Sequence, residues 1–404
     1  MTATLCLIAF GAVMVYSASS PLGAINGGGY GTGEFLVYML AAALGLVVMR
    51  LSEQFGLALL RRPELTTALV LGSGALLLGV LVPGIGRDVL GARRWFAAGP
   101  IQFQPSELTK LALVLYVARY LAENPRRLAR GFKPAIAPIA IVVGPSCLLI
   151  AVEPDLGTAL VCVCTVVAML VVAGVPAPYL GRIALFLLAG LGLMLLVHPY
   201  ELARLTAFLH PFSQRSSAGW QSAQSEMAVG AGGLGGVGLG QSVAKAMWLP
   251  EAQSDFILAV VGEELGFLGI LAVVVLYGMI AYAGMRTARR AGDRYRKLLA
   301  SGLTSLILCQ GTLNIFVVLG IAPLTGVPLP FISYAPTNLI VMLTSVGLLM
   351  GVARPATSRL RLVASEPTAA RTEVEREWST DRDRDRRYRR ARGAGARRGR
   401  AVEG

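Results

Sequence analysis

The chain has 404 residues, of which 55% are hydrophobic and only 15% are charged, and its formal net charge is +14. Soluble globular domains carry about 25% charged residues, so this composition excludes an ordinary soluble domain. Apolar runs of roughly 17–25 residues, the length that crosses a bilayer, recur along the sequence. Because these runs are continuous rather than alternating, they predict helices and an all-α polytopic membrane protein.

Ten membrane-spanning helices are predicted. In chain order they cover about residues 3–20, 35–51, 65–82, 106–122, 135–152, 157–174, 183–198, 256–285, 299–320 and 336–353. The connections after the second, fourth, sixth and eighth helices are basic, and carry Arg61 and Arg62; Arg126, Arg127, Arg130 and Lys133; Arg182; and Arg286, Arg289, Arg290, Arg294, Arg296 and Lys297. Short basic connections are typical of the cytoplasmic side, so both termini are predicted to be cytoplasmic.

Two connections on the opposite, outer side are long: residues 83–105 and residues 199–255, the latter between the seventh and eighth helices. Long loops in compact proteins are usually functional. Within the second loop, Gly230–Gly240 reads GAGGLGGVGLG, which lacks the Gly-Lys-Ser/Thr ending of a phosphate-binding P-loop. This segment is therefore interpreted as a tight re-entrant or interfacial turn rather than as a nucleotide site.

Residues 354–404 form a basic tail with 15 arginines and 8 acidic residues, which supplies half of the net charge. Such a run is found in nucleic-acid binders, but beside a membrane it more often lies on anionic lipid. We therefore predict a disordered cytoplasmic tail that contacts anionic lipid and no nucleic acid.

The cysteines and histidines do not indicate a metal site. The five cysteines lie within apolar runs and have neither disulfide nor metal-binding spacing. His198 and His210, near the start of the second long loop, lack a partner pattern and are interpreted as structural.

The fourth predicted helix opens with a pair of opposite charges. Pro105 or Ser106 can begin this helix, and a glutamate in the first turn suits the helix dipole. Glu107 and Lys110 are three residues apart and can pair on one face. Two interpretations are equally open: a structural salt bridge with a helix cap, or a cation positioned for an anionic substrate.

Further carboxylates occur at two other helix starts. Asp155 precedes an apolar run, which favours a structural N-cap over a catalytic role. Asp255 also precedes an apolar run, where periodicity does not distinguish an N-cap aspartate from a catalytic one. Its context favours catalysis, because desolvation at a helix start would raise the pKa of a carboxyl group, which suits a general base. Glu263 and Glu264 follow two turns deeper, where an unpaired carboxylate is costly, so one of them is expected to pair with a basic group or to cap buried polar groups.

Several short motifs stand in a distinctive order. They are MVYSAS at Met14–Ser19, GARRW at Gly91–Trp95, FQPSE at Phe103–Glu107, EPDLGTA at Glu153–Ala159, GWQ at Gly219–Gln221, GLGQS at Gly238–Ser242, LPEA at Leu249–Ala252, GEELG at Gly262–Gly266 and PLPFISY at Pro328–Tyr334. Together they resemble the SEDS family (shape, elongation, division and sporulation), which includes FtsW, RodA and SpoVE. The residues of these motifs resemble the FtsW/SpoVE branch more than RodA.

The resemblance implies a peptidoglycan glycosyltransferase whose residues 1–353 form a ten-helix transmembrane domain. Members polymerise lipid II on the outer face of the cytoplasmic membrane, with a class B penicillin-binding protein and other divisome or elongasome membrane proteins. The family's essential aspartate falls on Asp255, the implied base of an inverting transfer that releases undecaprenyl pyrophosphate. Candidate substrate-binding residues are Arg93, Glu107, Lys110, Gln241, Ser242, Lys245 and Ser333. The cations Arg93, Lys110 and Lys245, or a divalent ion such as Mg²⁺ or Mn²⁺, would stabilise the leaving charge.

One departure from the family's pattern keeps other functions open. The family usually continues Ser-Tyr with Gly-Gly-Ser-Ser, whereas this chain has Ala335, Pro336, Thr337 and Asn338. Pro336 can still sit in the first turn of a helix. The alternatives to a polymerase are a lipid II flippase and a weakly active scaffold that docks the transpeptidase.

Overall fold

The computed structural model describes residues 1–25, 32–60, 62–89, 92–98, 101–197, 205–206, 208–209, 219–246 and 248–354. The predictions for His198, His210 and the tail beyond Arg354 therefore lie outside the described residues. Residues Met1–Ala353 form one compact unit. Within the described part of this unit, helices predominate, as the composition predicts.

Ten long helices of the described chain match the predicted ones. They are α1 (Thr2–Ile25), α2 (Thr32–Leu51), α4 (Pro63–Leu81), α5 (Pro105–Glu123), α7 (Phe132–Val152), α8 (Leu156–Val172), α9 (Ala177–Val197), α12 (Ile257–Arg290), α13 (Arg294–Val318) and α14 (Pro336–Ala353). Among the described residues, seven helical stretches are long and apolar enough to cross a membrane. Pro105 and Pro336 begin their helices, as expected for a residue whose missing N–H costs nothing at that position.

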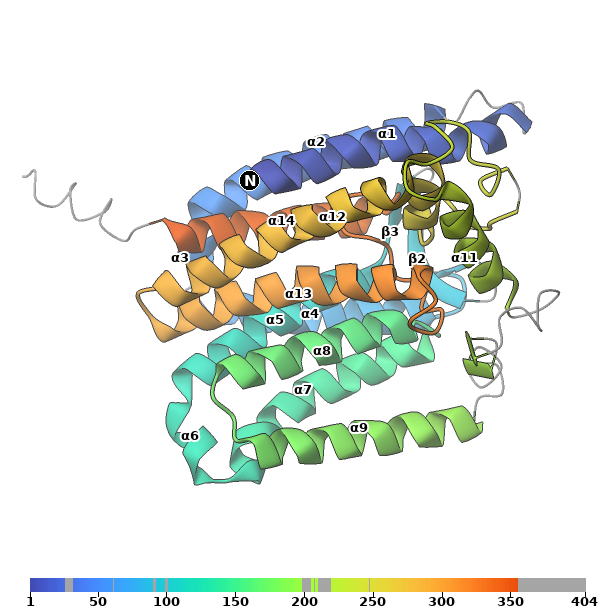
Figure 1. Ribbon diagram of the computed structural model, residues 1–404. Helices are drawn as coiled ribbons and strands as arrows, with labels where there is room; N and C mark the ends of the chain where they lie inside the picture. Colours follow the sequence, from blue (N-terminus) through green and yellow to red (C-terminus); the bar gives the residue numbers. More distant parts are fainter. Residues whose placement is uncertain are drawn as a thin grey trace, which may run out of the picture. The chain divides into compact units, whose positions relative to one another are not determined.

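The centre of the unit is occupied by α13 and α14 (Figure 1). α13 packs against α5, α8, α12 and α14, while α14 also packs against α2. Both central helices carry buried polar side chains, including Gln310 and Asn314 in α13 and Asn338 in α14. Because a buried polar group needs a partner, these residues mark where the helices are joined by hydrogen bonds.

Several short elements were not predicted from the sequence. The first long connection forms a three-stranded antiparallel sheet in the order β1 (Arg87–Val89), β2 (Ala92–Ala98), β3 (Ile101–Phe103). The second contains a helix, α11 (Trp220–Gly232), which is too polar to stand out as an apolar run. The other short elements are the π-helix η1 (Ser52–Gly56), α3 (Leu57–Leu59) and α6 (Pro125–Arg130).

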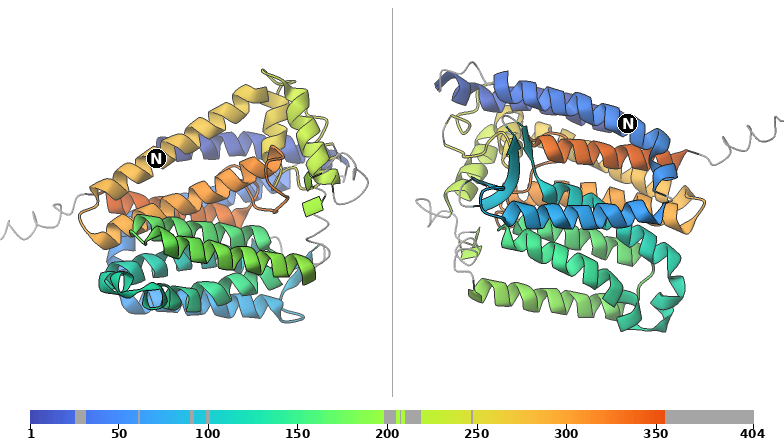
Figure 2. Two further views of the ribbon diagram at one scale, coloured as in Figure 1. Left: turned by 60° about the horizontal axis from the view of Figure 1, so that its bottom comes forward. Right: turned by 180° about the vertical axis from the view of Figure 1, so that it is seen from behind.

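The two ends of the helix bundle differ in structure. The sheet and α11 lie at one end, whereas α3, α6 and the connection from α12 to α13 lie at the other (Figures 1 and 2). The N-terminus and the end of α14 lie toward the end that carries α3 and α6. This division agrees with the predicted separation of short basic connections from long outer ones.

The long helix α12 is broken at Gly266, which has φ 65° and ψ −161°. Figure 2 shows the resulting change of direction. The backbone groups freed by the break bond to the glycine-rich turn that follows α11: the N–H groups of Val237 and Gly238 donate to the carbonyls of Glu263 and Glu264, at 2.9 and 3.0 Å. On the other side of the break, the Phe267 N–H donates to the carbonyl of Gly233 at 2.9 Å. The predicted tight turn is confirmed for residues 233–240, whereas residues 230–232 belong to α11.

Replacing Gly266 with alanine is expected to lower the thermal stability of the purified protein. The added Cβ would lie 2.5 Å from the Gly236 nitrogen and 2.6 Å from the Leu234 oxygen, and the positive φ strains any other residue. Gly278→Ala in the same helix is the matched control, since nothing lies within 4 Å of its Cβ. A glycine-to-alanine change raises the stability of the folded protein by up to about 1 kcal/mol where the backbone conformation allows it. Where the conformation does not allow it, the change lowers the stability by more than that. Equal melting temperatures for the two variants would contradict this account of the break.

Candidate functional site

Asp255 lies at the end of a tight turn that leads into α12. Phe256, not Asp255, occupies the N-cap position of that helix, so the alternative of a capping aspartate is wrong. The Asp255 N–H donates to the carbonyl of Glu251 at 3.1 Å. A Cβ built on Gly326 would lie 3.4 Å from Oδ2 of Asp255, so the carboxylate lies against the chain that precedes α14.

The turn that carries Asp255 is fixed by residues from α13 and from the segment before α14. Asn314 Nδ2 donates to the carbonyls of Asp255 and Val327, each at 2.8 Å. Ser333 Oγ donates to the carbonyl of Ser254 at 2.5 Å and accepts from the N–H of Leu329 at 2.8 Å. Ser333 therefore positions the turn through its backbone.

Glu107 and Lys110 form a buried ion pair at the start of α5, with the Lys110 Nζ 2.9 Å from the carboxylate. Lys110 Nζ also donates to Gln310 Oε1 at 2.6 Å, and Asn338 Nδ2 donates to Glu107 Oε2 at 2.7 Å. Both charged side chains are almost fully enclosed. This geometry fits the structural salt bridge that was one of the two interpretations of the sequence.

The segment 327–334 links this ion pair to Asp255. Gln310 Nε2 donates to the carbonyl of Pro328 at 2.9 Å, four residues along α13 from Asn314. Two tyrosines bind the same segment: Tyr277 Oη donates to the carbonyl of Pro330 at 2.5 Å, and Tyr38 Oη to that of Phe331 at 2.6 Å. Side chains from α2, α12 and α13 thus hold the backbone of one short segment.

The departure from the family's pattern is integrated into this network. Asn338 contacts Glu107, and Thr337 Oγ1 donates to the carbonyl of Gln102 at 3.0 Å. These two side chains therefore join the start of α14 to β3 and α5. The sequence marked Asn338 only as a departure from the family's pattern and did not identify Gln310 or Asn314, although amide side chains inside otherwise apolar helices are a signal of function or of helix pairing.

The hairpin between α7 and α8 approaches the same region. Asp155 caps α8 by accepting from the Thr158 N–H at 3.1 Å, so its predicted structural role is confirmed. Its other oxygen accepts from Gln104 Nε2 at 3.1 Å. A Cβ on Gly157 would collide with the carbonyl oxygen of Thr325, so the hairpin packs tightly just before segment 327–334.

Arg94, rather than its neighbour Arg93, holds this hairpin. Arg94 Nε donates to the carbonyl of Glu153 at 2.8 Å, and its guanidinium also donates to the carbonyl of Pro154. Arg93 is half-buried on β2, in register with Asp88 of β1. The structure thus brings Arg94 to the hairpin and leaves Arg93 at the sheet.

Glu153 is buried, and neither of its carboxylate oxygens has a hydrogen-bond partner within the described chain. The pKa of this carboxyl is raised from 4.5 to about 8, mainly by burial and in part by the charge of Asp155, while Arg94 opposes the shift. The folded protein therefore holds a proton at Glu153 that the unfolded chain releases near pH 4.5.

Glu153→Gln is expected to flatten the pH dependence of stability. In the wild type, the free energy of unfolding should fall as the pH rises from 4.5 to about 8, because in this range the folded state binds the proton and the unfolded state does not. The glutamine cannot ionise, so its stability relative to wild type should rise across that window. Melting temperatures measured from pH 4.5 to 8 test this. Glu123→Gln, at an exposed glutamate, is the control. If the melting temperatures of the wild type and Glu153→Gln changed in parallel with pH, the prediction for Glu153 would be refuted.

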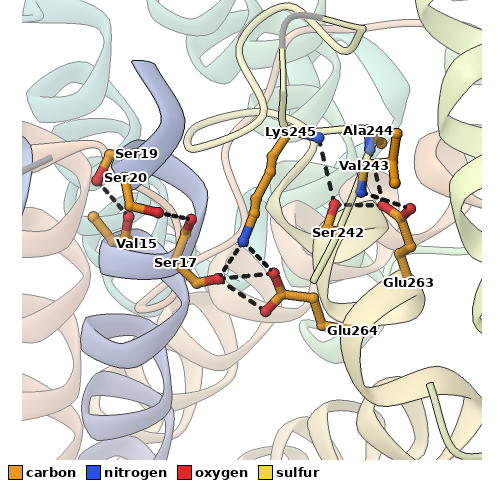
Figure 3. A network of polar contacts seen from close by, with 10 residues as sticks. All are labelled: Val15, Ser17, Ser19, Ser20, Ser242, Val243, Ala244, Lys245, Glu263 and Glu264. Carbon is orange, nitrogen blue, oxygen red and sulfur yellow. Dashed lines mark hydrogen bonds and ion pairs between the residues drawn. The ribbon is translucent and has the colours of Figure 1, made fainter. Parts of the chain in front are cut away.

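The other candidate residues form a second buried network, shown in Figure 3. Lys245 Nζ lies 2.6 Å from Glu264 Oε1 and 2.9 Å from Ser17 Oγ in α1, and Ser17 donates to the same carboxylate. Glu263 accepts from the Ser242 hydroxyl and from the N–H groups of Val243 and Ala244, at 3.0 and 3.2 Å.

The prediction that one of Glu263 and Glu264 pairs with a basic group or caps buried polar groups is confirmed, and the partners lie in α1 and in the loop. Lys245 and Ser242 are buried in these contacts, whereas Gln241 is exposed. The ammonium of Lys245 is therefore already neutralised by Glu264 in this arrangement.

The described residues offer no cage of protein ligands alone for a divalent cation. Among the residues that the structure describes, no group of three or more His, Cys, Asp or Glu side chains is arranged to hold a metal ion. Mg²⁺ and Mn²⁺ prefer several oxygen ligands, of which carboxylates are the usual anchors. No step proposed below is routed through such an ion.

The fold and the buried polar networks define a polytopic helical membrane protein in which Asp255 directly precedes the broken helix α12. Residues 1–358 match the family described as "Cell cycle protein", FtsW/RodA/SpoVE. The chain belongs to this family, as the motifs predicted.

Relatives and a solved structure agree with this assignment. The chain is 37% identical to "Stage V sporulation protein E" of Bacillus subtilis over 87% of this chain and 95% of the relative. It is 38% identical to "Probable peptidoglycan glycosyltransferase FtsW" of Trichlorobacter lovleyi, over 86% and 90%. A solved structure described as "Structural coordination of polymerization and crosslinking by a peptidoglycan synthase complex" aligns with a TM-score of 0.69 and 29% identity, over 87% of this chain and 97% of that chain.

Proposed function

We propose that this protein is a peptidoglycan glycosyltransferase that polymerises lipid II, and that Asp255 is its catalytic base. The observation that carries the proposal is the position of Asp255 directly before α12, where Asn314 and the preceding turn fix its backbone. A carboxylate whose backbone is fixed in this way is held at a defined place for proton transfer from a substrate. Relatives named as probable peptidoglycan glycosyltransferases support the reaction class.

The proposed reaction is a transfer with inversion. Asp255 accepts the proton of the 4-hydroxyl of the acceptor N-acetylglucosamine, and that oxygen forms a bond to C1 of the donor N-acetylmuramic acid. The bond from C1 to the pyrophosphate oxygen breaks, and undecaprenyl pyrophosphate leaves with the electron pair. A positioned base contributes typically 10²–10⁴-fold to such a step. Of the three candidate cations, Lys110 and Lys245 are enclosed, and half-buried Arg93 is the one proposed to face the leaving group.

The flippase alternative is less well supported by the distribution of charge. A flippase needs a polar path through the whole bundle. Here Glu107, Lys110 and Asp155 lie at the starts of α5 and α8, which are near the sheet, and each is engaged in local contacts. The scaffold alternative rested on the altered Ala335–Asn338 segment, and the contacts of Thr337 and Asn338 weaken it.

The decisive experiment uses purified protein with a class B penicillin-binding protein and labelled lipid II. The proposal expects glycan chains from lipid II by the wild type. Absence of chains, together with transfer of lipid II across vesicle membranes, would favour the flippase. Absence of both, with the transpeptidase still bound, would favour the scaffold.

The membrane arrangement and partner form part of the same proposal. Residues 1–353 form a ten-helix domain in the cytoplasmic membrane, with both termini cytoplasmic and the loop 199–255 outside, where lipid II is displayed. The Lys and Arg of the short connections support this orientation. A class B penicillin-binding protein is the proposed partner, supported by the similar structure described as a peptidoglycan synthase complex. The cellular process, division or shape control, follows from which partner docks.

Deleting residues 365–404 is expected to leave polymerisation intact. This part of the tail holds most of its arginines, and its proposed role is contact with anionic lipid rather than chemistry. The truncated protein should polymerise labelled lipid II at the wild-type rate in detergent and bind less tightly to anionic vesicles. Lost polymerisation in detergent would overturn this assignment.

A further inference from the structure

The loop from Leu234 to Trp248 has an unusual distribution of polarity. Five large apolar side chains project from it with exposed fractions between 47% and 77%: Leu234, Val237, Leu239, Val243 and Trp248. Residues 227–244 contain no charged side chain. The charged residue that ends this stretch, Lys245, points inward to Glu264 (Figure 3).

Hydrogen bonds and a buried ion pair hold the loop in the conformation that exposes these apolar side chains. Glu263 fixes residues 242–244 through a hydroxyl and two backbone N–H groups, and Lys245 is tied to Ser17 and Glu264. On the other side, Val237 and Gly238 bond to the backbone of α12. Polar groups inside and apolar groups outside are the reverse of a water-facing loop, and exposed apolar groups gathered in this way mark an interaction surface.

The exposed apolar surface of the loop continues along α12. Phe267 and Leu268, the first residues after the break, bond through their N–H groups to the carbonyls of Gly233 and Leu234. Both side chains are exposed, as are Leu271, Val274, Val275 and Met279 further along the helix. Because α12 is apolar and long enough to cross a membrane, this row faces lipid, and the loop extends it.

Two tryptophans indicate the depth of the loop. The rings of Trp220 and Trp248 stack with centroids 6.2 Å apart, and Trp220 Nε1 donates to the carbonyl of Trp248 at 3.0 Å. Trp248 is half exposed. Indole rings gather at the boundary between headgroups and acyl chains, where one end is apolar and the other wet.

We propose that the described residues of this loop, 234–246 and Trp248, insert into the membrane at the end of the bundle that carries the sheet, with the acyl-chain boundary of the bilayer as their binding partner. The loop then serves as an interfacial anchor that holds the break of α12, and the turn before it, at a fixed depth. The absence of charge along residues 227–244 favours lipid over a protein partner that would be recognised by ion pairs.

The test is fluorescence quenching in vesicles of phosphatidylcholine brominated on its acyl chains. The full-length protein carries four tryptophans: Trp95, Trp220, Trp248 and Trp378. The quenched fraction should fall markedly in Trp248→Phe, a conservative change at an exposed ring, and should not fall in Trp378→Phe, the matched control in the tail. Equal quenched fractions in the two variants would overturn the proposal.

A second measurement uses a protein with Trp248 as its single tryptophan. Its fluorescence should be quenched by brominated lipid and shielded from iodide in vesicles. Quenching by iodide but not by brominated lipid would place the loop in water and overturn the proposal. Iodide shielding that appears only after the transpeptidase is added would assign the surface to a protein partner and likewise overturn it.

Discussion

Replacing Asp255 with alanine or asparagine is expected to abolish detectable polymerisation of lipid II while the protein stays folded. Two contacts that fix the turn are made by the backbone of Asp255 and survive either change: its N–H donates to the carbonyl of Glu251, and its carbonyl accepts from Asn314. Loss of a general base alone lowers the rate by about 10²–10⁴-fold. The asparagine variant keeps the shape of the side chain and removes only its basicity.

The measurement is the initial rate of glycan formation from labelled lipid II, with the melting temperature recorded for each variant. Glu251→Gln is the matched control, because Glu251 is an exposed carboxylate of the same turn. It should polymerise at a rate near that of the wild type. Glycan chains from Asp255→Ala at the wild-type rate would show that another group is the base.

Lys245→Met is expected to have the largest effect on stability. The change leaves the Glu264 carboxylate buried, with the Ser17 hydroxyl as its remaining side-chain partner among the described residues. Removing one partner of a buried ion pair costs about 3–5 kcal/mol, since the remaining charge is uncompensated. The melting temperature of the purified protein without substrate should therefore fall strongly.

The double variant Lys245→Met with Glu264→Gln distinguishes a lost charge balance from lost packing. Removing both charges should recover much of the stability, because a buried ion pair is often no better than a neutral pair. Arg50→Met is the surface control: Arg50 pairs with Glu53 at 3.0 Å but is exposed, and such pairs contribute about 0–1 kcal/mol. A single variant at Lys245 as stable as the wild type would refute the structural role of this pair.

The sequence predicted those features that depend on neighbours along the chain. The ten long helices follow from the length of the apolar runs, and the proline starts and the Asp155 cap follow from local rules. The sheet was missed because residues 87–103 show no regular alternation, and α11 because it is short and polar. Periodicity carries no signal for such elements.

Partners that lie far apart along the chain could not be derived from the sequence. Ser17 and Glu264 are 247 positions apart, and Glu107 and Asn338 are 231 apart. Local patterns indicated that Glu263 and Glu264 need partners, but not which residues supply them. The same holds for Asp255, where the sequence left a helix cap and a catalytic base open, and only the position of Phe256 at the N-cap removed the first.

The way in which segment 327–334 is held has a consequence for sequence variation. The groups that bind it from α2, α12 and α13 all bond to its main-chain carbonyls, those of Val327, Pro328, Pro330 and Phe331. A carbonyl is the same whatever side chain it carries, so substitutions that keep the backbone path preserve these bonds. Insertion or deletion of a single residue within the segment would shift the carbonyls on one side of the change away from their donors. The chain here is constrained in its length as well as by the packing of its buried side chains.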